Sequence, residues 1–148
     1  MQATKGINFD DINYEKSFKT TQVYAQSKLA NILHAKELAR KLENSGISVH
    51  VLHPGVIMTE LSRHFEKWIP SFINFLTLPI ARFIFKTPFH GAQTTLFCVL
   101  DDSLEGQSGK YYADCGEAKT SGKYAQDAEY AKKFWRFSEE LISNKKTQ

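Results

Sequence analysis

A helix-forming segment that leads through a glycine turn into a strand is the feature that most restricts how this chain can fold. Apolar residues recur at helical spacing over residues 21–43, and Asn44-Ser45-Gly46 then supplies a stop, with Gly46 suited to the left-handed C′ position. Residues 47–53 are rich in β-branched side chains and end sharply at Pro54-Gly55. Helix, turn and strand in this order form the αβ half of a βαβ unit, which predicts a parallel sheet in an α/β fold.

The helical segment has one apolar stripe and one charged face. Thr20 or Thr21 can cap its start. The apolar stripe is formed by Leu29, Ile32, Leu33, Leu38, Ala39 and Leu42. The residues predicted to face solvent are Lys36, Glu37, Arg40 and Lys41. Before the helix, the apolar side chains of Ile7, Phe9 and Ile12 are predicted to attach a polar N-terminal segment to the core.

Tyr24 and Lys28 lie four residues apart near the start of this helix and therefore share one face, about one turn apart. A phenol beside an ammonium group suits proton transfer, because a nearby positive charge favours the phenolate and so lowers the pKa of a phenol. The same spacing also arises by chance in a chain with many lysines. On the spacing alone, a catalytic pair and a structural pair both remain open.

The loop that follows the strand, residues 53–59, leaves the carboxyl end of that strand. Ligands of open parallel sheets bind outside the carboxyl ends of the strands. Pro54-Gly55 would let the backbone approach a ligand closely, and Thr59 offers a hydroxyl group. A simple strand-terminating turn would also contain Pro-Gly, so that alternative stays open here.

Composition narrows the class of protein. With 148 residues, 42% apolar and 24% charged, the chain is predicted to be one globular domain. Its net charge of +3 reflects dispersed lysines, so no nucleic-acid partner is predicted. Cys98 and Cys115 have no metal-ligand spacing, which predicts structural thiols, no metal and a reducing compartment. Residues 1–6 carry no apolar core of a signal peptide.

The remainder of the chain predicts a lid and three further elements. Residues 60–90 are aromatic but interrupted by prolines and polar residues, so they are too broken to span a membrane. They are predicted to form a lid over an apolar ligand that can dip into a membrane interface; a pair of ordinary amphipathic helices is the alternative. A short helix over 91–100, a strand over 110–114 and a final helix over 128–142 complete the expected order.

Several motifs together resemble the short-chain dehydrogenase/reductase family. The first is Tyr24-x-x-x-Lys28 on its helix, and the second is the strand that ends in Pro54-Gly55 with Thr59 four residues on. Longer strings are closer to the retinol dehydrogenase-like branch of that family. These strings are INFDD at 7–11, YAQSKLAN at 24–31, LHPGV at 52–56 and GKYYADC at 109–115.

The resemblance implies roles for individual residues. Tyr24 would be the general acid/base, and Lys28 would favour its ionised form and hydrogen-bond the nicotinamide ribose. Thr59 would lie close to the nicotinamide carboxamide or the phosphates. The backbone that lies against the nicotinamide would belong to Pro54, Gly55 and Ile57. The cofactor would be NADP or NAD, with NADP slightly favoured, and it would carry the hydride.

The resemblance also implies which part of such an enzyme is present. None of the eight glycines forms the glycine-rich dinucleotide fingerprint, and neither Ser17 nor Ser27 matches the place of the family's catalytic serine. The expected fold is therefore the C-terminal half of a Rossmann-type doubly wound parallel sheet that lacks the N-terminal dinucleotide-binding strands. Residues 1–148 would be the C-terminal portion of a single domain, with the catalytic helix, nicotinamide loop, lid, last strand and last helix.

The implied activity is an NAD(P)-dependent oxidoreductase that interconverts an apolar alcohol, of the retinol type, and its aldehyde or ketone. The chain alone is expected to be inactive as a fragment. The alternative is a catalytically inactive half-domain that acts as a binding or membrane-interface module. An intracellular location is implied, either associated with the endoplasmic reticulum membrane or cytoplasmic, and the oligomeric state is left open.

Overall fold

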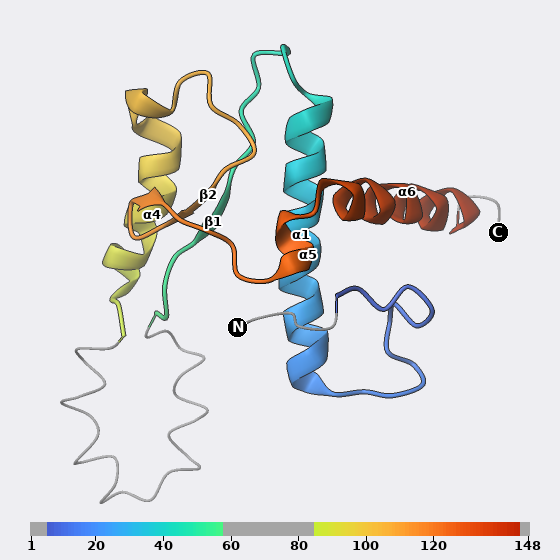
Figure 1. Ribbon diagram of the computed structural model, residues 1–148. Coiled ribbons are helices and arrows are strands. Elements are labelled where there is room, and N and C mark those ends of the chain that lie inside the picture. The colour runs from blue at the N-terminus through green and yellow to red at the C-terminus, as the bar shows by residue number, and fades with distance from the viewer. Residues whose placement is uncertain (1–5, 58–84, 146–148) are drawn as a thin grey trace, which may run out of the picture. The chain divides into compact units, whose positions relative to one another are not determined.

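The computed structural model describes residues 6–57 and 85–145 and shows a mixed α/β protein (Figure 1). Its residues divide into two compact units. Unit 1 comprises Met1–Val51, Gly106–Tyr111 and Lys119–Gln148, and unit 2 comprises Leu52–Glu105 and Tyr112–Ala118.

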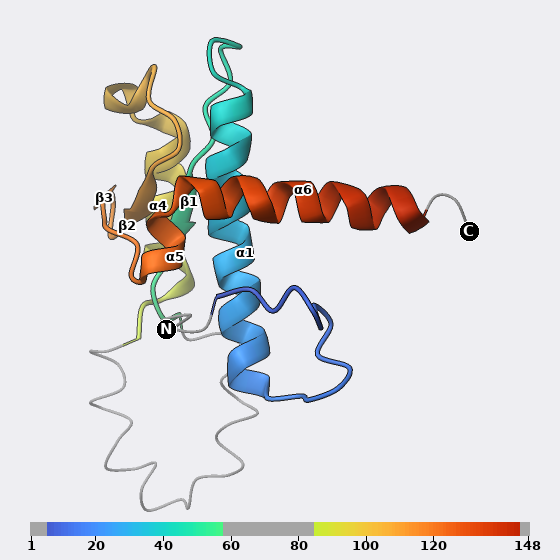
Figure 2. The same cartoon turned by 45° about the vertical axis from the view of Figure 1, so that its right-hand side comes forward.

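Unit 1 is built on the packing of two long helices. Helix α1 spans Thr20–Lys41, α5 is the short helix Lys123–Gln126, and α6 spans Ala128–Lys145. Figures 1 and 2 show α6 crossing α1 rather than running along it. The buried core of this unit consists of Ile7, Leu29, Leu33, Ala125 and Ala131, with Phe9 and Ile12 among the side chains packed against it. The predicted attachment of the N-terminal segment is therefore confirmed.

Helix α1 agrees with the predicted segment to within two residues, but both predicted end signals are wrong. The N-cap is Lys19, which makes no side-chain capping hydrogen bond. At the other end, the Leu42 carbonyl accepts hydrogen bonds from the Ser45 N–H at 3.0 Å and from the Ser45 hydroxyl at 2.7 Å. This turn ends the helix early, so Gly46, at φ 77°, lies in the turn beyond the helix rather than at C′.

Glu37 was predicted to face solvent, and this prediction is also wrong. Its side chain is buried, with 4% of the residue exposed. Arg40, one turn further along α1, donates two hydrogen bonds to the carboxylate at 2.9 and 2.6 Å. These bonds lower the pKa of Glu37 below its ordinary value, and the charges of Arg40, Lys41 and Lys132 of α6 act in the same direction, against the opposing effect of burial. The face carrying Glu37 packs toward α6, which a single-helix pattern does not reveal.

Three short strands form a sheet in the order β1-β2-β3. They span Val51–His53, Tyr111–Ala113 and Gly116–Glu117. Strands β2 and β3 are antiparallel, with Tyr112 opposite Glu117 and Ala113 opposite Gly116. Both strands predicted at 47–53 and 110–114 exist but are shorter than expected, and β3 was not predicted.

The backbone leading into β1 and β2 is bonded as parallel strands are. The Gly109 N–H donates to the Val49 carbonyl at 2.7 Å, and the Val51 N–H donates to the Lys110 carbonyl at 2.9 Å. The two bonds advance in the same direction along both segments, in agreement with the predicted parallel pairing. Val49 lies before the strand proper because its N–H bonds the Ser108 hydroxyl, at 3.0 Å, instead of a ladder carbonyl.

In unit 2, helix α4 spans Pro88–Leu100 and the 3-10 helix η1 spans Asp102–Leu104. The predicted start at residue 91 is three residues late. Pro88 stands in the first turn, where its missing N–H costs nothing, and the Thr87 hydroxyl accepts from the His90 N–H at 3.3 Å. Together Thr87 and Pro88 therefore begin the helix one turn earlier than its apolar pattern indicates.

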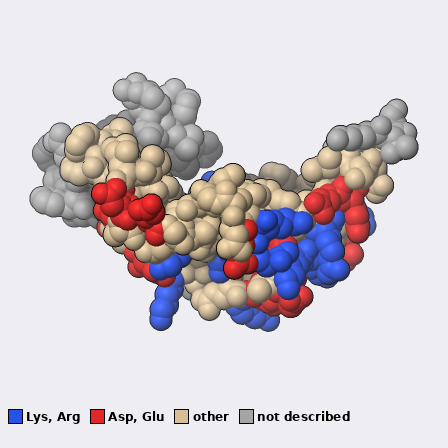
Figure 3. Space-filling model, turned by 90° about the horizontal axis from the view of Figure 1, so that it is seen from above, with Lys and Arg blue, Asp and Glu red and all other residues tan. Residues whose placement is uncertain are grey.

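Most of the predicted lid, residues 60–84, lies outside the described residues. Within the part of the chain that the structure describes, none of the helices combines the length and apolar character that a membrane crossing requires. On the face seen in Figure 3, Lys and Arg side chains lie next to Asp and Glu side chains, so charges of both signs share that surface.

Candidate active site

The two predicted catalytic side chains meet on an exposed face of α1. Tyr24 is 52% exposed, and the Lys28 Nζ atom lies 5.3 Å from the centroid of its ring. Both residues lie on the side of α1 away from the buried Leu33 and Glu37, as helical geometry requires for this spacing. The phenol and the ammonium therefore form a pair whose reactive groups remain accessible.

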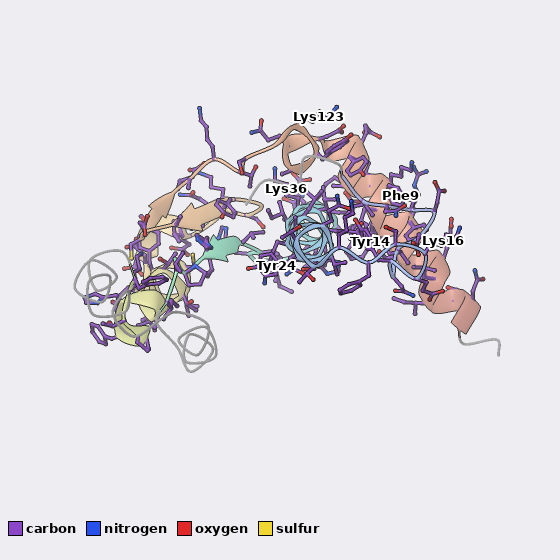
Figure 4. All side chains as sticks on the ribbon, turned by 90° about the horizontal axis from the view of Figure 1, so that it is seen from below. Phe9, Tyr14, Lys16, Tyr24, Lys36 and Lys123 are labelled. Carbon is purple, nitrogen blue, oxygen red and sulfur yellow. The ribbon has the colours of Figure 1, made fainter. Side chains whose placement is uncertain are left out.

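Figure 4 places Tyr24 on the opposite side of α1 from Phe9 and Tyr14 of the N-terminal segment. That segment is fixed to the helix by the side chain of Gln26, which is buried. The Gln26 side-chain carbonyl accepts from the Asn8 N–H at 2.8 Å, and its amide donates to the Ile12 carbonyl at 3.0 Å. Gln26, two residues from Tyr24, thus binds the N-terminal segment to one side of α1, and Tyr24 lies on the other side.

The hydroxyl of Ser27, between Tyr24 and Lys28 in sequence, bonds the backbone of its own helix. This hydroxyl donates to the backbone carbonyl of Tyr24 at 2.8 Å. A serine hydroxyl bonded to the preceding turn of its own helix is directed along the backbone.

The second group of predicted site residues lies in unit 2, directly after β1. Gly55 has φ 89°, in the left-handed region that favours glycine. The Val56 carbonyl accepts from the Lys86 N–H at 2.8 Å, and Ile57 forms a parallel bridge with Lys86. Pro54, Gly55 and Ile57 are thus brought together in one ordered loop at the carboxyl end of β1. Thr59 lies outside the described residues.

Lys86 is a feature of this loop that the sequence did not reveal. Its ammonium forms an ion pair with Asp114, and its aliphatic stem lies against Gly55. The hydrogen bond and charge of Lys86, and more weakly the charge of His53, lower the pKa of Asp114 below its ordinary value. Asp114 is part of the string at 109–115 that carries the resemblance, but nothing in the sequence connects it to a lysine so far away.

Helix α4 packs against the same loop at Gly91. A Cβ atom built on Gly91 would come within 2.2 Å of the Ile57 Cδ1 atom. The Ile57 side chain therefore occupies the space that a side chain at position 91 would need. Further along α4, the fully buried Thr94 accepts a hydrogen bond from the Cys115 N–H at 3.3 Å. Ile57 and the hairpin turn are therefore both held by α4.

Among the described residues, the thiols and carboxylates give no sign of a metal site. Within residues 6–57 and 85–145, no group of three His, Cys, Asp or Glu side chains is placed to hold a metal ion. Both cysteines are free; Cys115 is exposed, and Cys98 is partly buried. Burial is the main cause that raises the pKa of Cys98, with a smaller contribution from Cys115. A raised thiol pKa disfavours the reactive thiolate.

The chain is similar to curated dehydrogenases along most of its length. It is 43% identical over 136 residues to retinol dehydrogenase 14 of Homo sapiens, which covers 92% of this chain and 40% of that protein. It is 39% identical over 137 residues to retinol dehydrogenase 13 of Mus musculus, covering 92% of this chain and 41% of that protein. Short-chain dehydrogenase TIC 32 B, chloroplastic, of Brassica napus is 38% identical over 144 residues, with 95% and 43% covered.

A solved structure supports the fold. A crystal structure of an uncharacterized protein from Mycobacterium Paratuberculosis matches with a TM-score of 0.60 and 25% identity, over 97% of this chain and 47% of that chain. No protein-family model matches the sequence. The chain spans about two fifths of the length of the curated relatives, 40% to 41% for the two retinol dehydrogenases.

The fold agrees with part of a Rossmann-type α/β domain, as expected from the sequence. The similarity of the chain to the short-chain dehydrogenase/reductase family is thereby confirmed. Within that family the similarity is to its retinol dehydrogenase-like branch, over 92% of the chain.

Proposed function

We propose that this chain provides the proton-transfer part of the active site of an NAD(P)-dependent oxidoreductase. The observation that carries the proposal is the exposed Tyr24 with the Lys28 ammonium over its ring, on α1. The retinol dehydrogenases named above support an apolar alcohol of the retinol type, and its aldehyde or ketone, as the substrate pair.

In the reducing direction, Tyr24 donates the proton of its hydroxyl to the oxygen of the substrate as negative charge develops there. The phenolate that remains is stabilised by the positive charge of Lys28. In the oxidising direction the same phenolate accepts the proton of the alcohol. Both steps need an accessible phenol, and the exposure of Tyr24 meets that requirement.

A nicotinamide cofactor supplies the hydride when bound. For its nicotinamide end, the resemblance assigns the ammonium of Lys28, in unit 1, to a ribose hydroxyl and the backbone of Gly55, in unit 2, to the ring. Pro54, Ile57 and Thr59 would complete the contacts with that end. No glycine-rich fingerprint occurs in the sequence, so no residue here is assigned to the pyrophosphate. NADP is proposed before NAD, and an intracellular location, at the endoplasmic reticulum membrane or in the cytoplasm, is proposed with it.

The test is a chimera in which this chain replaces the corresponding segment of human retinol dehydrogenase 14. Oxidation of NADPH with retinal is followed for the chimera and for its Tyr24→Phe and Lys28→Met variants. General acid/base catalysis contributes about 10²–10⁴-fold, so Tyr24→Phe should lower kcat by about that factor. A loss of only a few-fold would refute the role of Tyr24.

The chain offers a matched control for this pair. The Lys123 Nζ atom lies 4.9 Å from the centroid of the Tyr124 ring. This contact joins the same two residue types, lysine and tyrosine, at a distance similar to that between Lys28 and Tyr24. Tyr124→Phe and Lys123→Met should leave kcat unchanged within a few-fold. The 148-residue chain alone is expected to show essentially no turnover, and robust turnover there would contradict its proposed status as a fragment.

A non-catalytic binding module is the second candidate. It is favoured by the exposed apolar side chains of α4, namely Phe89, Leu96, Val99 and Leu100. This candidate predicts that Tyr24→Phe and Tyr124→Phe have the same small effect, and that the unmodified chimera shows no turnover with retinal.

A further inference from the structure

We propose that Lys86 is a positioning residue that holds the loop of residues 54–57 in the shape that accepts the nicotinamide. It acts through its backbone, its aliphatic stem and its ammonium group together. The inference rests on the proposed function, because that function assigns this loop to the nicotinamide. It adds a residue that lies outside every motif on which the resemblance depends.

The backbone of Lys86 pairs with the loop. Its N–H donates to the Val56 carbonyl at 2.8 Å, and Ile57 and Lys86 form a parallel bridge. This pairing continues the direction of β1 past the point where the strand ends at His53. The loop is therefore not a free turn, because one side of its backbone is bonded to a segment far along the chain.

The stem of Lys86 occupies the space beside Gly55. A Cβ atom built on Gly55 would lie 2.9 Å from the Lys86 Cδ atom and 3.1 Å from Cε. Gly55 also has φ 89°, a conformation that side chains with a Cβ rarely adopt. Lysine stems cover apolar and backbone surface while the charged head stays in contact with water. The stem thus covers Gly55 and restricts its backbone.

The ammonium of Lys86 is anchored at a second fixed point. It pairs with Asp114, which begins the two-residue turn of the β2–β3 hairpin. Asp114 and Cys115 have φ values of 53° and 56°, as the turns of tight hairpins require. The Cys115 N–H in turn bonds the buried Thr94 of α4. Lys86 therefore connects the loop to a hairpin turn that α4 itself holds.

The two contributions of the Lys86 side chain differ in size. The side chain of Lys86 is 31% exposed and that of Asp114 is 76% exposed, so solvent weakens their ion pair. An exposed pair of this kind changes an equilibrium by only about 1.4-fold to 5-fold. The stem, which lies against Gly55, should contribute more. Removing the whole side chain is therefore expected to disturb the loop more than removing its charge.

The first measurement is amide hydrogen exchange over residues 51–57 and at residue 86 in the 148-residue chain. Lys86→Met keeps most of the stem and should raise the exchange rates by about 1.4-fold to 5-fold. Lys86→Ala should raise them about tenfold, and Lys86→Arg should restore them to within about twofold of the unmodified chain.

Lys132 supplies a matched control. Its Nζ atom pairs with the Glu129 carboxylate at 2.6 Å, and the two side chains are 38% and 78% exposed, close to the values for Lys86 and Asp114. Lys132→Met and Lys132→Ala should leave the exchange of residues 51–57 unchanged. If Lys86→Ala behaves like Lys132→Ala, Lys86 does not hold the loop and the inference is wrong.

The second measurement connects the loop to its ligand, with nicotinamide mononucleotide as the probe and amide chemical shifts of Gly55 and Ile57 as the readout. Lys86→Ala should raise the apparent Kd for the probe about tenfold, and Lys86→Met by less. An unchanged Kd in Lys86→Ala overturns the inference. So does the absence of any probe-dependent shift at these amides in the unmodified chain, whatever the exchange data show.

Failure of the inference and failure of the proposed function give different results. If Tyr24→Phe abolishes turnover in the chimera while Lys86→Ala leaves probe binding intact, the proposed function stands and the role of Lys86 is refuted. If Tyr24→Phe has no effect while Lys86→Ala loosens the loop and weakens probe binding, the loop assignment stands and the acid/base assignment is refuted.

Discussion

The two units hold their proposed functional residues in different ways. In unit 1, Tyr24 and Lys28 stand on a helix whose other side is fixed by apolar side chains such as Leu29 and Leu33. In unit 2, the loop at Gly55 is held by a backbone hydrogen bond, a lysine stem and an ion pair. A packed helix can present reactive groups to solvent without losing their spacing, whereas this loop depends on a few individual contacts from a residue distant in sequence.

The largest expected effect concerns the apolar core that fixes α1 in unit 1. Leu33→Ala removes a side chain that is fully buried in the core of unit 1 and should lower the free energy of unfolding by about 2–5 kcal/mol. Urea denaturation followed by circular dichroism measures the change. Leu141→Ala, at a side chain 39% exposed near the end of α6, is the control and should cost well under half as much. Equal losses would mean that Leu33 is not in a packed core.

The second effect concerns Gly91, whose missing side chain leaves room for Ile57 in unit 2. Gly91→Ala places a methyl group 2.2 Å from the Ile57 Cδ1 atom, and such overpacking costs about 1–3 kcal/mol. Thermal unfolding measures the loss. The double variant Gly91→Ala with Ile57→Val removes Cδ1, the nearer of the two clashing carbons, and should recover part of the stability, because Cγ1 would still lie 2.8 Å from the new methyl group. Gly116→Ala, whose nearest contact would be an ordinary 3.9 Å to the Ala113 carbonyl, should be close to neutral.

The third effect concerns the buried carboxylate of unit 1. Glu37→Gln replaces the two charged hydrogen bonds from Arg40 and should cost about 1 kcal/mol at neutral pH. The pKa of Glu37 is lowered in the folded chain, so its stabilisation is present above the ordinary value of 4.5 and is lost as the pH falls through the folded pKa.

Unfolding measured from pH 7 to pH 3 checks this third prediction. The difference between Glu37→Gln and the unmodified chain should shrink as the solution becomes acidic. Glu129→Gln, which breaks an exposed ion pair with Lys132, serves as the control and should show a smaller difference throughout. A difference that grows in acid would contradict the assigned direction of the pKa shift.

The smallest effect concerns the exposed carboxylate of unit 2. The pKa of Asp114 is also lowered, chiefly by Lys86, so its contribution too is present above the ordinary pKa and is lost as the pH falls through the lowered one. Because Asp114 is exposed, Asp114→Asn should lower Tm less than Glu37→Gln does, and 1 M NaCl should remove most of the difference. A loss that salt does not reduce would show a role for Asp114 beyond its charge.

Local patterns predicted the parts of the fold that depend on neighbours in sequence. The apolar repeat of α1, the β-branched residues before Pro54 and the apolar repeat of α6 each identified an element, because the 3.6-residue and two-residue periods are set by the backbone alone. The ends were less predictable. The Ser45 bonds to the Leu42 carbonyl and the cap formed by Thr87 and Pro88 moved helix boundaries by a few residues.

Residues whose environment comes from a distant segment were predicted wrongly or missed. Glu37 has the chemistry of a surface residue, yet it is buried where Arg40 neutralises it and Lys132 of α6 adds a further positive charge. Lys86 belongs to no motif. Its partner Val56 lies well before it in the sequence, and its partner Asp114 lies well after it. No periodicity in the sequence records such contacts.

The spacing of Tyr24 and Lys28 and the placement of Pro54-Gly55 after a strand were determined by the sequence itself, since helix geometry and turn chemistry act over a few residues. The tertiary structure decided which side of α1 would be buried, and so left Tyr24 accessible. It also decided that a lysine stem would lie on Gly55. Burial and long-range contacts depend on how whole elements pack together, and that packing is fixed only when the chain has folded.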